Sequence, residues 1–198
     1  TDHLFDGSKS MVGENEIYSP LNKYGETKAE AELGIQKYCD KALIIRTNFF
    51  GWGLPYRKSF SDNIIFSLRK NMNINMYDDV FFTPILIEEL IKNIHQLYKL
   101  NCHGIFNVVS SDRISKYKFS QIICDIFKLD HSLVIKTLAK EKKSFVKRPL
   151  DMSLSNYKLC KALKIQRIPL ERSIKDLFKE EQKGLLKFDY EKKSNQIF

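Results

Sequence analysis

Residues 19–45, SPLNKYGETKAEAELGIQKYCDKALII, decide the fold class, because an amphipathic stretch leads directly into a short apolar run. Ser19 is a suitable N-cap and Pro20 a suitable first helical residue, and apolar side chains then recur at helical spacing to about Tyr38. Residues 42–45, ALII, are continuously apolar, which is typical of a parallel strand covered on both faces. A helix followed by a buried strand predicts an α/β protein.

The same alternation continues beyond a turn-forming segment, GWGLP, at residues 51–55. Further helices are expected at 60–68, 87–100, 115–127, 155–163 and 170–182, and further strands at 74–77, 104–109 and 133–138. We expect Ser155 to cap the helix over 155–163 and residues 187–198 to form a loose polar tail.

The net charge of +9 is unevenly distributed along the 198 residues. Residues 1–135 carry 16 basic and 16 acidic side chains, whereas residues 136–198 carry 17 and 8. The last third therefore favours anions. Its lysines are spread at helical intervals without interleaved aromatic residues, so we expect a solvated face or a phosphate-bearing small substrate rather than nucleic acid.

The composition indicates a globular protein of the cytoplasm. A hydrophobic content of 43% is enough for a buried core, and no apolar run approaches the roughly 18 residues that span a bilayer. The first residues, TDHLF, do not resemble a signal peptide. Cys39, Cys102, Cys124 and Cys160 are widely spaced without a zinc-ligand pattern, so we expect reduced thiols and no metal site.

The glycines do not form a phosphate-binding loop. None of the eight builds a G-x-G-x-x-G or Walker-type pattern after a strand. The chain also opens at what reads as the end of a strand, since Leu4 and Phe5 form too short an apolar run for a whole buried one. We therefore expect a piece of a longer protein, and residues 1–198 alone should bind nicotinamide dinucleotides weakly and be inactive.

Tyr24 and Lys28 are the strongest candidates for chemistry. They are four residues apart, so they share one face of the expected helix. A phenol has a reference pKa of about 10, and a neighbouring ammonium favours the phenolate and lowers that pKa toward the working range. Tyr24 can then protonate a carbonyl oxygen as hydride reaches carbon, Lys28 can also bind ribose hydroxyls, and the Thr1 hydroxyl can hold the carbonyl in place.

The sequence around this pair resembles that of the extended short-chain dehydrogenases. Residues 1–7, TDHLFDG, and 19–32, SPLNKYGETKAEAE, are similar to the T-D-x-x-F-x-G and S-P-L-N-x-Y-G-x-T-K-x-x-x-E motifs of the dTDP-4-dehydrorhamnose reductase group. The likeness extends to about residue 180 through RTNFFG at 46–51, DDVFFTP at 78–84 and RPLDMSLS at 148–155.

This resemblance implies the second half of a Rossmann-type parallel sheet joined to a small, mainly helical substrate-binding domain. Residues 1–53 would be the C-terminal part of the NAD(P)-binding domain with the catalytic helix. Residues 54–186 would be mainly the substrate-binding domain, with interleaved segments that return to the sheet. The implied reaction is the reduction, by NADPH or NADH, of the 4-keto group of a nucleoside-diphosphate deoxysugar used in cell-surface polysaccharide synthesis.

The resemblance also assigns roles to residues of the Tyr24 helix and of the segment after the buried strand. The implied catalytic residues are Thr1, Tyr24 and Lys28. The implied cofactor contacts, on the nicotinamide side of the pocket, are Tyr24, Lys28, Asn48, Phe49 and Phe50.

Asn63 and Arg148 are the corresponding candidates for substrate contact. Arg148 has a physical argument of its own, because a guanidinium binds phosphate oxygens bidentately and a nucleotide sugar always offers a diphosphate. Arg57, in the loop after Gly53, is a further candidate for the same anion.

Several alternatives stay open at the level of sequence. The loop over residues 80–85, VFFTPI, is more apolar than the rhamnose-pathway pattern, so the sugar is not fixed. The choice of NADH or NADPH is open too, because in the resembling family it is made by residues of an N-terminal region that these 198 residues do not include. An epimerase or epimerase/reductase would use the same tyrosine and lysine with a retained cofactor. A non-catalytic nucleotide-binding regulatory subunit is the alternative from another class. The expected partner is a nucleoside-diphosphate sugar, without nucleic acid or membrane, and a homodimer is left open.

Overall fold

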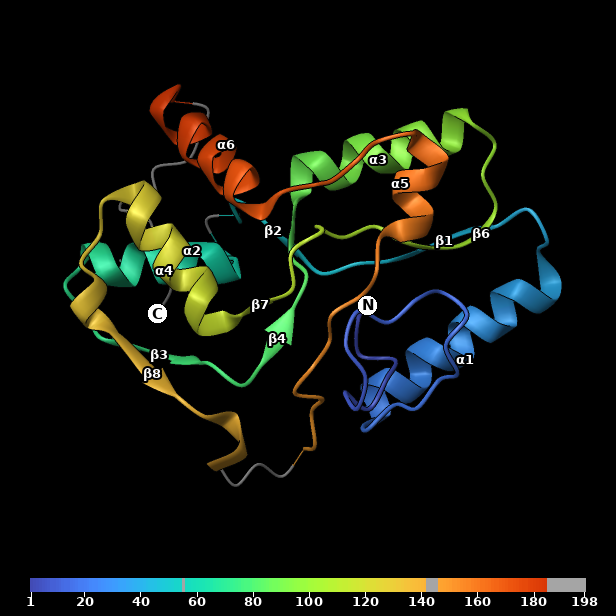
Figure 1. Ribbon diagram of the computed structural model, residues 1–198, viewed down its shortest axis with the longest axis horizontal. Coiled ribbons are helices and arrows are strands. Elements are labelled where there is room, and N and C mark those ends of the chain that lie inside the picture. Colours follow the sequence, from blue (N-terminus) through green and yellow to red (C-terminus); the bar gives the residue numbers. More distant parts are fainter. Residues whose placement is uncertain (55, 142–145, 185–198) are drawn as a thin grey trace.

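The computed structural model describes residues 1–54, 56–141 and 146–184, and it has a mixed α/β architecture (Figure 1). The helices are α1 (Lys23–Tyr38), α2 (Phe60–Arg69), α3 (Ile87–Lys99), α4 (Lys116–Phe127), α5 (Tyr157–Leu163) and α6 (Leu170–Gln182), with 3-10 turns at His131–Leu133 and Ala139–Glu141. The strands are β1 (Leu43–Arg46), β2 (Phe49–Phe50), β3 (Ile74–Tyr77), β4 (Phe81–Phe82), β5 (Ile85–Leu86), β6 (Gly104–Asn107), β7 (Ile114–Ser115) and β8 (Val134–Thr137).

The predicted α/β class is confirmed, and every helix and strand expected from periodicity is present with small differences at its ends. The cap predicted at Ser19 is wrong: α1 begins four residues later, and the side chain of Asn22 accepts a hydrogen bond from the amide of Gly25. The Ser19 hydroxyl accepts instead from the amide of Asp6. The cap predicted at Ser155 is also wrong, because α5 begins at Tyr157 and its N-cap is Asn156. The expected tail at 187–198 lies outside the described residues.

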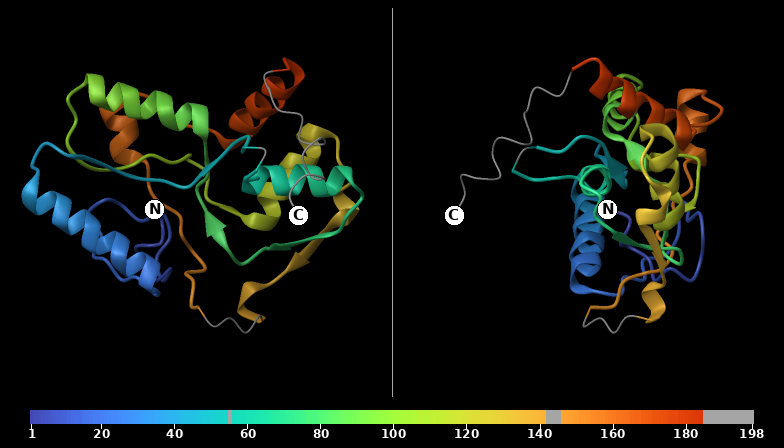
Figure 2. Two further views of the ribbon diagram at one scale, coloured as in Figure 1. Left: turned by 180° about the vertical axis from the view of Figure 1, so that it is seen from behind. Right: turned by 90° about the vertical axis from the view of Figure 1, so that its left-hand side faces the viewer.

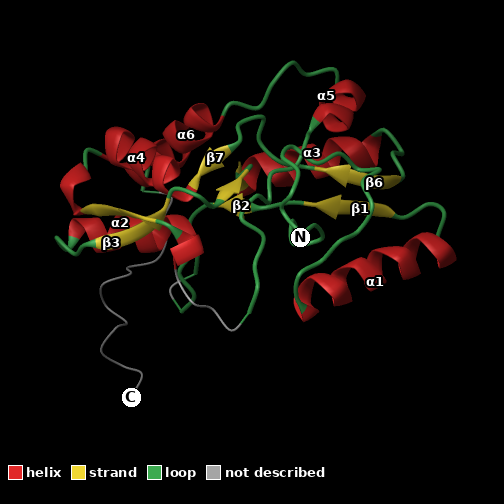
Figure 3. Ribbon diagram, turned by 60° about the horizontal axis from the view of Figure 1, so that its bottom comes forward, coloured by secondary structure: helices red, strands yellow, loops and turns green. Residues whose placement is uncertain are grey.

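Strands β1 and β6, which are far apart in the sequence, pair in parallel. Leu43 of β1 is opposite Gly104 of β6, and Arg46 is opposite Asn107. Helix α1 lies on one side of this pair, and α3 with α5 lies on the other (Figures 1 and 3). The same arrangement is seen from behind in Figure 2. This layering is that of a parallel sheet covered by helices on both faces.

The segment over residues 51–54 follows β2, and the chain then enters a second group of elements. Gly51 adopts φ +154°, and a Cβ placed on it would lie 2.6 Å from Cγ2 of Ile87, so a glycine is required there. Helices α2, α4 and α6 and the parallel pair β3–β8 then form a separate apolar core that contains Phe119 and Ile123. Strands β5 and β6 return to pair with β2 and β1. The division of the chain at residue 53 into two domains stays a prediction.

A buried ion pair joins α1 to β1. The side chain of Arg46 is fully buried, its Nε donates to Oε2 of Glu32 at 2.9 Å, and its Nη2 donates to the hydroxyl of Tyr18 at 3.0 Å. The guanidinium carbon lies 5.4 Å from the ring centroid of Phe5 and 5.1 Å from that of Tyr18. Charge, hydrogen bonds and aromatic faces therefore hold the helix, the strand and the first residues together.

Gly25 allows the first turn of α1 to touch the segment before it. A Cβ at this position would lie 2.3 Å from the carbonyl oxygen of His3 and 2.8 Å from Cβ of Pro20. Gly34, about two and a half turns away on the same helix, has no neighbouring atom within 4 Å of its Cβ position. The two glycines are thus a matched pair for a test of this contact.

We predict opposite effects for alanine at these two positions. Gly25→Ala should lower the free energy of unfolding by about 1 to 3 kcal/mol, because the new methyl group meets backbone that cannot move aside. Gly34→Ala should raise it by about 0.5 to 1 kcal/mol through helix propensity alone. Denaturant titration followed by circular dichroism measures both. Equal effects of the two substitutions would contradict the close approach at Gly25.

A second feature of the fold is an acidic contact between α6 and α3. Partial burial raises the pKa of the Glu180 carboxyl to about 7, and the nearby carboxylates of Glu88 and Asp176 act in the same direction. The folded state therefore holds this proton more tightly than the unfolded state, whose carboxyl titrates near its ordinary value of 4.5. As pH rises from about 4.5 to about 7, the unfolded state ionises first and folding becomes less favourable.

Glu180→Gln should consequently stabilise the protein at pH 8 and not at pH 4. Because the side chain is still partly exposed, solvent screening reduces the gain to about 0.5 to 1 kcal/mol. The exposed Glu30→Gln on α1 is the control, with a small effect at both pH values. The melting temperature recorded from pH 4 to 8 provides the comparison, and a constant difference between wild type and Glu180→Gln would rule out this titration.

Within the described residues, no helix combines the length and the apolar character needed to cross a bilayer.

Candidate active site

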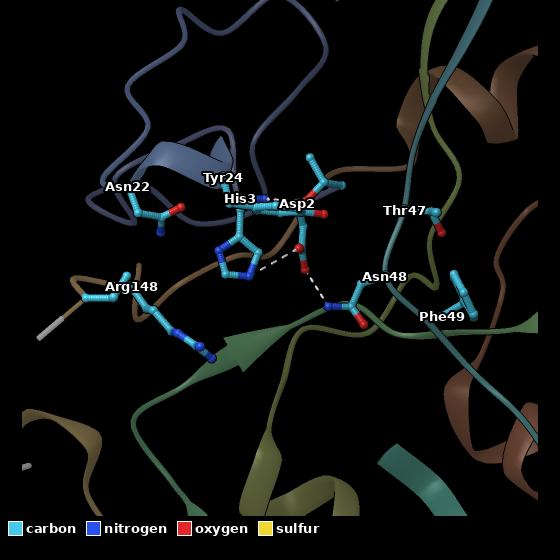
Figure 4. A pocket seen from close by; sticks show the side chains of 10 residues that line it. Asp2, His3, Asn22, Tyr24, Thr47, Asn48, Phe49 and Arg148 are labelled. Atoms are coloured by element: carbon cyan, nitrogen blue, oxygen red, sulfur yellow. Dashed lines mark hydrogen bonds and ion pairs between the residues drawn. The ribbon is translucent and has the colours of Figure 1, made fainter. Parts of the chain in front are cut away.

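A cavity of about 550 Å³ lies between the start of the chain, the first turn of α1 and the segment that joins β1 to β2 (Figure 4). Residues from four parts of the sequence line it: Thr1, Asp2, His3, Asn22, Tyr24, Thr47, Asn48, Phe49, Val146 and Arg148. Five of the residues predicted for the site are among them, namely Thr1, Tyr24, Asn48, Phe49 and Arg148.

Tyr24 projects from the first turn of α1, and 52% of its surface is exposed. Its ring meets the ring of His3 edge-on, with 5.6 Å between the centroids. Lys28 follows one turn later, and its Nζ lies 5.8 Å from the centroid of the Tyr24 ring. The helix therefore places the phenol on the cavity and the ammonium beside the phenol, as the four-residue spacing predicts.

Thr1 and Asn48 both line the cavity. The hydroxyl of Thr1 accepts a hydrogen bond from the amide of His3 at 3.2 Å. The side-chain amide of Asn48 donates to the carboxylate of Asp2, which is almost fully buried. Asn48 is in turn fixed by its carbonyl, which accepts from the amide of Ile85 at 2.9 Å. The polar wall is thereby attached to both β2 and β5.

His3 and Asp2 were not predicted as site residues. Nε2 of His3 lies 3.9 Å from Oδ1 of Asp2 (Figure 4). Burial lowers the pKa of the His3 imidazole, the cations Arg148 and Lys116 lower it further, and the Asp2 carboxylate opposes them. His3 is therefore a neutral imidazole at pH 7. The sequence signal for both was their position directly before the buried residues Leu4 and Phe5.

Asn22 links the helix to the segment that carries Arg148. Besides capping α1, it donates from Nδ2 to the carbonyl of Lys147 at 3.0 Å. Further along this segment, Asp151 forms a salt bridge with Arg113, in which Oδ2 of Asp151 lies 2.6 Å from Nη2 of Arg113. The Arg113 guanidinium carbon lies 3.7 Å from the ring centroid of Phe81. These contacts hold Arg148 at the edge of the cavity.

A second cavity of about 510 Å³ adjoins the first and shares His3, Val146 and Arg148 with it. Its charged lining is entirely basic and consists of Lys116, Lys140, Lys147 and Arg148. Its apolar lining includes Leu21, Val80, Pro149, Leu150 and Met152, and Tyr77 adds an aromatic ring. A pocket with cations at one side and apolar groups at the other suits a phosphorylated ligand with an aromatic base.

Four predicted site residues line neither cavity: Lys28, which lies beside the Tyr24 ring, and Phe50, Asn63 and Arg57. Phe50 is 2% exposed and packs edge-on against Phe119 in the core, because successive strand residues point to opposite faces and its neighbour Phe49 takes the cavity side. The prediction that Phe50 contacts the cofactor is therefore not supported by its position. Asn63 is exposed on α2, and Arg57 is exposed in the loop before α2, and neither lines a cavity.

The first cavity fits a nicotinamide ring and its ribose. Thr47, which lines it, has a buried hydroxyl without a hydrogen-bond partner among the described residues, and such a group is satisfied by a polar ligand. Phe49 supplies an exposed ring, and Tyr24 and Lys28 supply donors for hydroxyl groups. No group of three or more potential metal ligands is found in the part of the chain that the structure describes.

Comparison with known proteins finds relatives that include a dTDP-4-dehydrorhamnose reductase and a methionine adenosyltransferase subunit. The chain is 29% identical over 129 residues to the dTDP-4-dehydrorhamnose reductase of Escherichia coli K12, which covers 62% of this chain and 42% of that protein. It is 24% identical over 184 residues to methionine adenosyltransferase 2 subunit beta of Danio rerio, covering 89% and 57%. The chain thus spans about half the length of these curated relatives.

The fold is shared with solved reductases. The crystal structure of dTDP-4-dehydrorhamnose reductase from Bacillus anthracis in complex with NADP superposes with a TM-score of 0.81 at 20% identity, covering 90% of this chain and 63% of that one. The corresponding structure from Clostridium acetobutylicum gives 0.80 at 24% identity, covering 91% and 64%. The model of the RmlD substrate binding domain matches residues 1–183, and the chain therefore belongs to the RmlD substrate-binding domain family.

Proposed function

We propose that this chain carries the catalytic and sugar-binding part of an NAD(P)H-dependent reductase that acts on the 4-keto group of a nucleoside-diphosphate deoxysugar. One observation carries the proposal: Tyr24, Thr1 and Asn48 line one cavity, and Arg148 connects that cavity to a second one with a basic lining. The relatives named dTDP-4-dehydrorhamnose reductase support the same substrate class.

The residues divide the reaction between them. A nicotinamide, when bound, would supply hydride to the carbonyl carbon. Tyr24 donates its phenolic proton to the carbonyl oxygen. The Lys28 ammonium beside the ring offsets the negative charge left on the phenol oxygen after proton transfer, and it binds ribose hydroxyls. Thr1 hydrogen-bonds the carbonyl oxygen and orients it toward Tyr24. Neutral His3, edge-on to Tyr24, packs against the phenol without adding a competing charge.

Arg148 binds the diphosphate of the substrate in this proposal, and Asn22 and Asp151 hold its segment in place. The cofactor is NADPH or NADH, and solved neighbours are described in complex with NADP or with NAD. We further propose a cytoplasmic enzyme of polysaccharide sugar synthesis.

A regulatory subunit is the second candidate, and a specific observation favours it. The relative from Danio rerio, which matches 89% of this chain, is named as a subunit of methionine adenosyltransferase. Turnover distinguishes the two: a reductase consumes one NAD(P)H for each 4-keto sugar reduced, whereas a regulatory subunit binds the dinucleotide without consuming it. An epimerase with the same tyrosine and lysine would instead retain NAD through purification and show no net consumption.

Tyr24→Phe removes one oxygen and keeps the ring. In the intact enzyme we expect kcat for a 4-keto nucleotide sugar to fall at least about a hundredfold, because a positioned general acid contributes roughly 10²- to 10⁴-fold. Tyr38→Phe is the matched control, since Tyr38 is on the same helix, is 80% exposed and lies at the far end from the cavity. Steady-state kinetics with NADPH absorbance measure both variants. A Tyr24→Phe enzyme with near-normal kcat would remove Tyr24 from its proposed role.

Lys28→Met tests whether the lysine and the tyrosine act in one step. Groups that work as a unit have non-additive effects, so the Tyr24→Phe/Lys28→Met double variant should be little slower than the slower single variant. Multiplication of the two single losses in the double variant would show that Lys28 acts independently of Tyr24.

A further inference from the structure

Lys116 is a partly buried cation for which the described residues offer no anionic partner. It is the first residue of α4, and its position is fixed by the cap at Ser115 and by its own amide, which donates to the carbonyl of Val80 at 3.0 Å. Its Nζ makes no hydrogen bond or ion pair with any residue in the described ranges, and it lies 5.5 Å from the ring centroid of Phe60. Burial lowers the pKa of this ammonium, as expected for a charge removed from water.

The surroundings of Lys116 add positive charge. Arg148 lines the same cavity and repels the Lys116 ammonium, and both cations also act on His3. Asp2 is the nearby carboxylate that favours the charged form of Lys116, but it already receives the amide of Asn48 and faces His3. Two cations that face one cavity without a dedicated counter-ion are costly unless an anion of the ligand lies between them.

The position of that anion follows from the two cavities. Arg148 lines both, so a group bound between Lys116 and Arg148 is adjacent to the cavity that contains Tyr24. In a nucleoside-diphosphate sugar the diphosphate directly joins the sugar to the nucleoside. A sugar bound at Tyr24 therefore places its diphosphate at the junction and its nucleoside in the second cavity, against Tyr77 and the apolar wall.

We propose that Lys116 is a substrate-binding residue that, together with Arg148, holds the diphosphate of the nucleotide sugar. This inference rests on the proposed function for the identity of the ligand. It adds the first residue of α4 to the residues that contact the substrate. The two cations of the basic lining have different roles in this proposal. Arg148 binds phosphate oxygens in a bidentate manner, and Lys116 neutralises them as a point charge.

The experiment compares nucleoside diphosphate with nucleoside. In the intact protein, calorimetry with thymidine diphosphate, uridine diphosphate and uncharged thymidine is carried out for wild type, Lys116→Met and Lys116→Arg. Lys118→Met is the matched control, because it removes the same charge from the same helical turn, and its side chain is exposed and lines neither cavity.

Lys116→Met should raise the Kd of the diphosphate that wild type binds by on the order of tenfold to a hundredfold, which corresponds to one charge-assisted hydrogen bond. Thymidine binding should be unchanged. Lys116→Arg should recover most of the loss, and Lys118→Met should change the Kd by less than about threefold. In turnover, the loss caused by Lys116→Met should be concentrated in KM, because a diphosphate is held alike in the ground and transition states.

A purely structural role for Lys116 gives a different pattern. If its contact with Phe60 mattered only for stability, Lys116→Met would lower the melting temperature of the ligand-free protein and leave the Kd of the diphosphate unchanged, and the proposal would be overturned. Lys116→Gln repeats the measurement with a smaller polar side chain in case the methionine variant does not fold. A Lys116-dependent Kd in a protein that reduces no 4-keto sugar would uphold this anion site and refute the proposed reaction.

Discussion

The buried pair of Arg46 and Glu32 is the interaction on which the rest of this structure depends. It joins the strand β1 to the helix α1, and the guanidinium is enclosed by the rings of Phe5 and Tyr18. The pair itself contributes little net free energy, since both charges lose their hydration, but the loss of one partner leaves the other charge buried at a cost of about 3 to 5 kcal/mol. Any other packing of α1 against β1 would leave Arg46 or Glu32 buried without its partner, so the ion pair selects one packing of helix against strand.

The position of the reactive groups follows from that packing. Tyr24 and Glu32 are on the same helix, and Asn48 follows Arg46 by two residues, so the ion pair holds together the two segments that bring Tyr24 and Asn48 to one cavity. Glu14 extends the same network to β6. Its backbone carbonyl accepts a hydrogen bond from the Arg46 guanidinium, and its carboxylate accepts one from the backbone amide of Asn107. The chemistry at one end of the helix is therefore supported by charged side chains that lie outside both cavities of the candidate site.

The order of helices and strands could be predicted because apolar runs and helical periodicity are local properties of the sequence. The helix ends were harder to predict, because Ser19 and Asn22 are both good caps. The Ser19 hydroxyl accepts a hydrogen bond from the backbone amide of Asp6, in another part of the chain, and Asn22 caps the helix instead. A similar limit applied to Phe49 and Phe50, since neighbouring strand residues face opposite sides and the sequence does not say which side is the core.

The candidate site could be predicted in part for the same reason. Tyr24, Lys28 and Arg148 belong to recognisable motifs, and Tyr24 and Arg148 line the cavity with Lys28 beside the Tyr24 ring. His3 and Lys116 acquire their importance only when distant segments bury them together, so no local pattern revealed them. Asp2 is similar, because its carboxylate becomes informative only beside Asn48.

The parallel pairing of β1 with β6 has a consequence for how the site is made during synthesis. In the described chain, the strand partner of Leu43 is Gly104, so the two can pair only after residue 104 has been synthesised. The β-bridge between Val12 and Leu154 can form only later still. Closing such long loops is entropically costly and makes folding slow. On the ribosome, α1 with its tyrosine is therefore translated early. Its long-range contacts form late, after the segment that contains Arg148 has emerged. The apolar residues of β1 stay exposed in the interval, and this is the stage at which the nascent chain depends most on protection from aggregation.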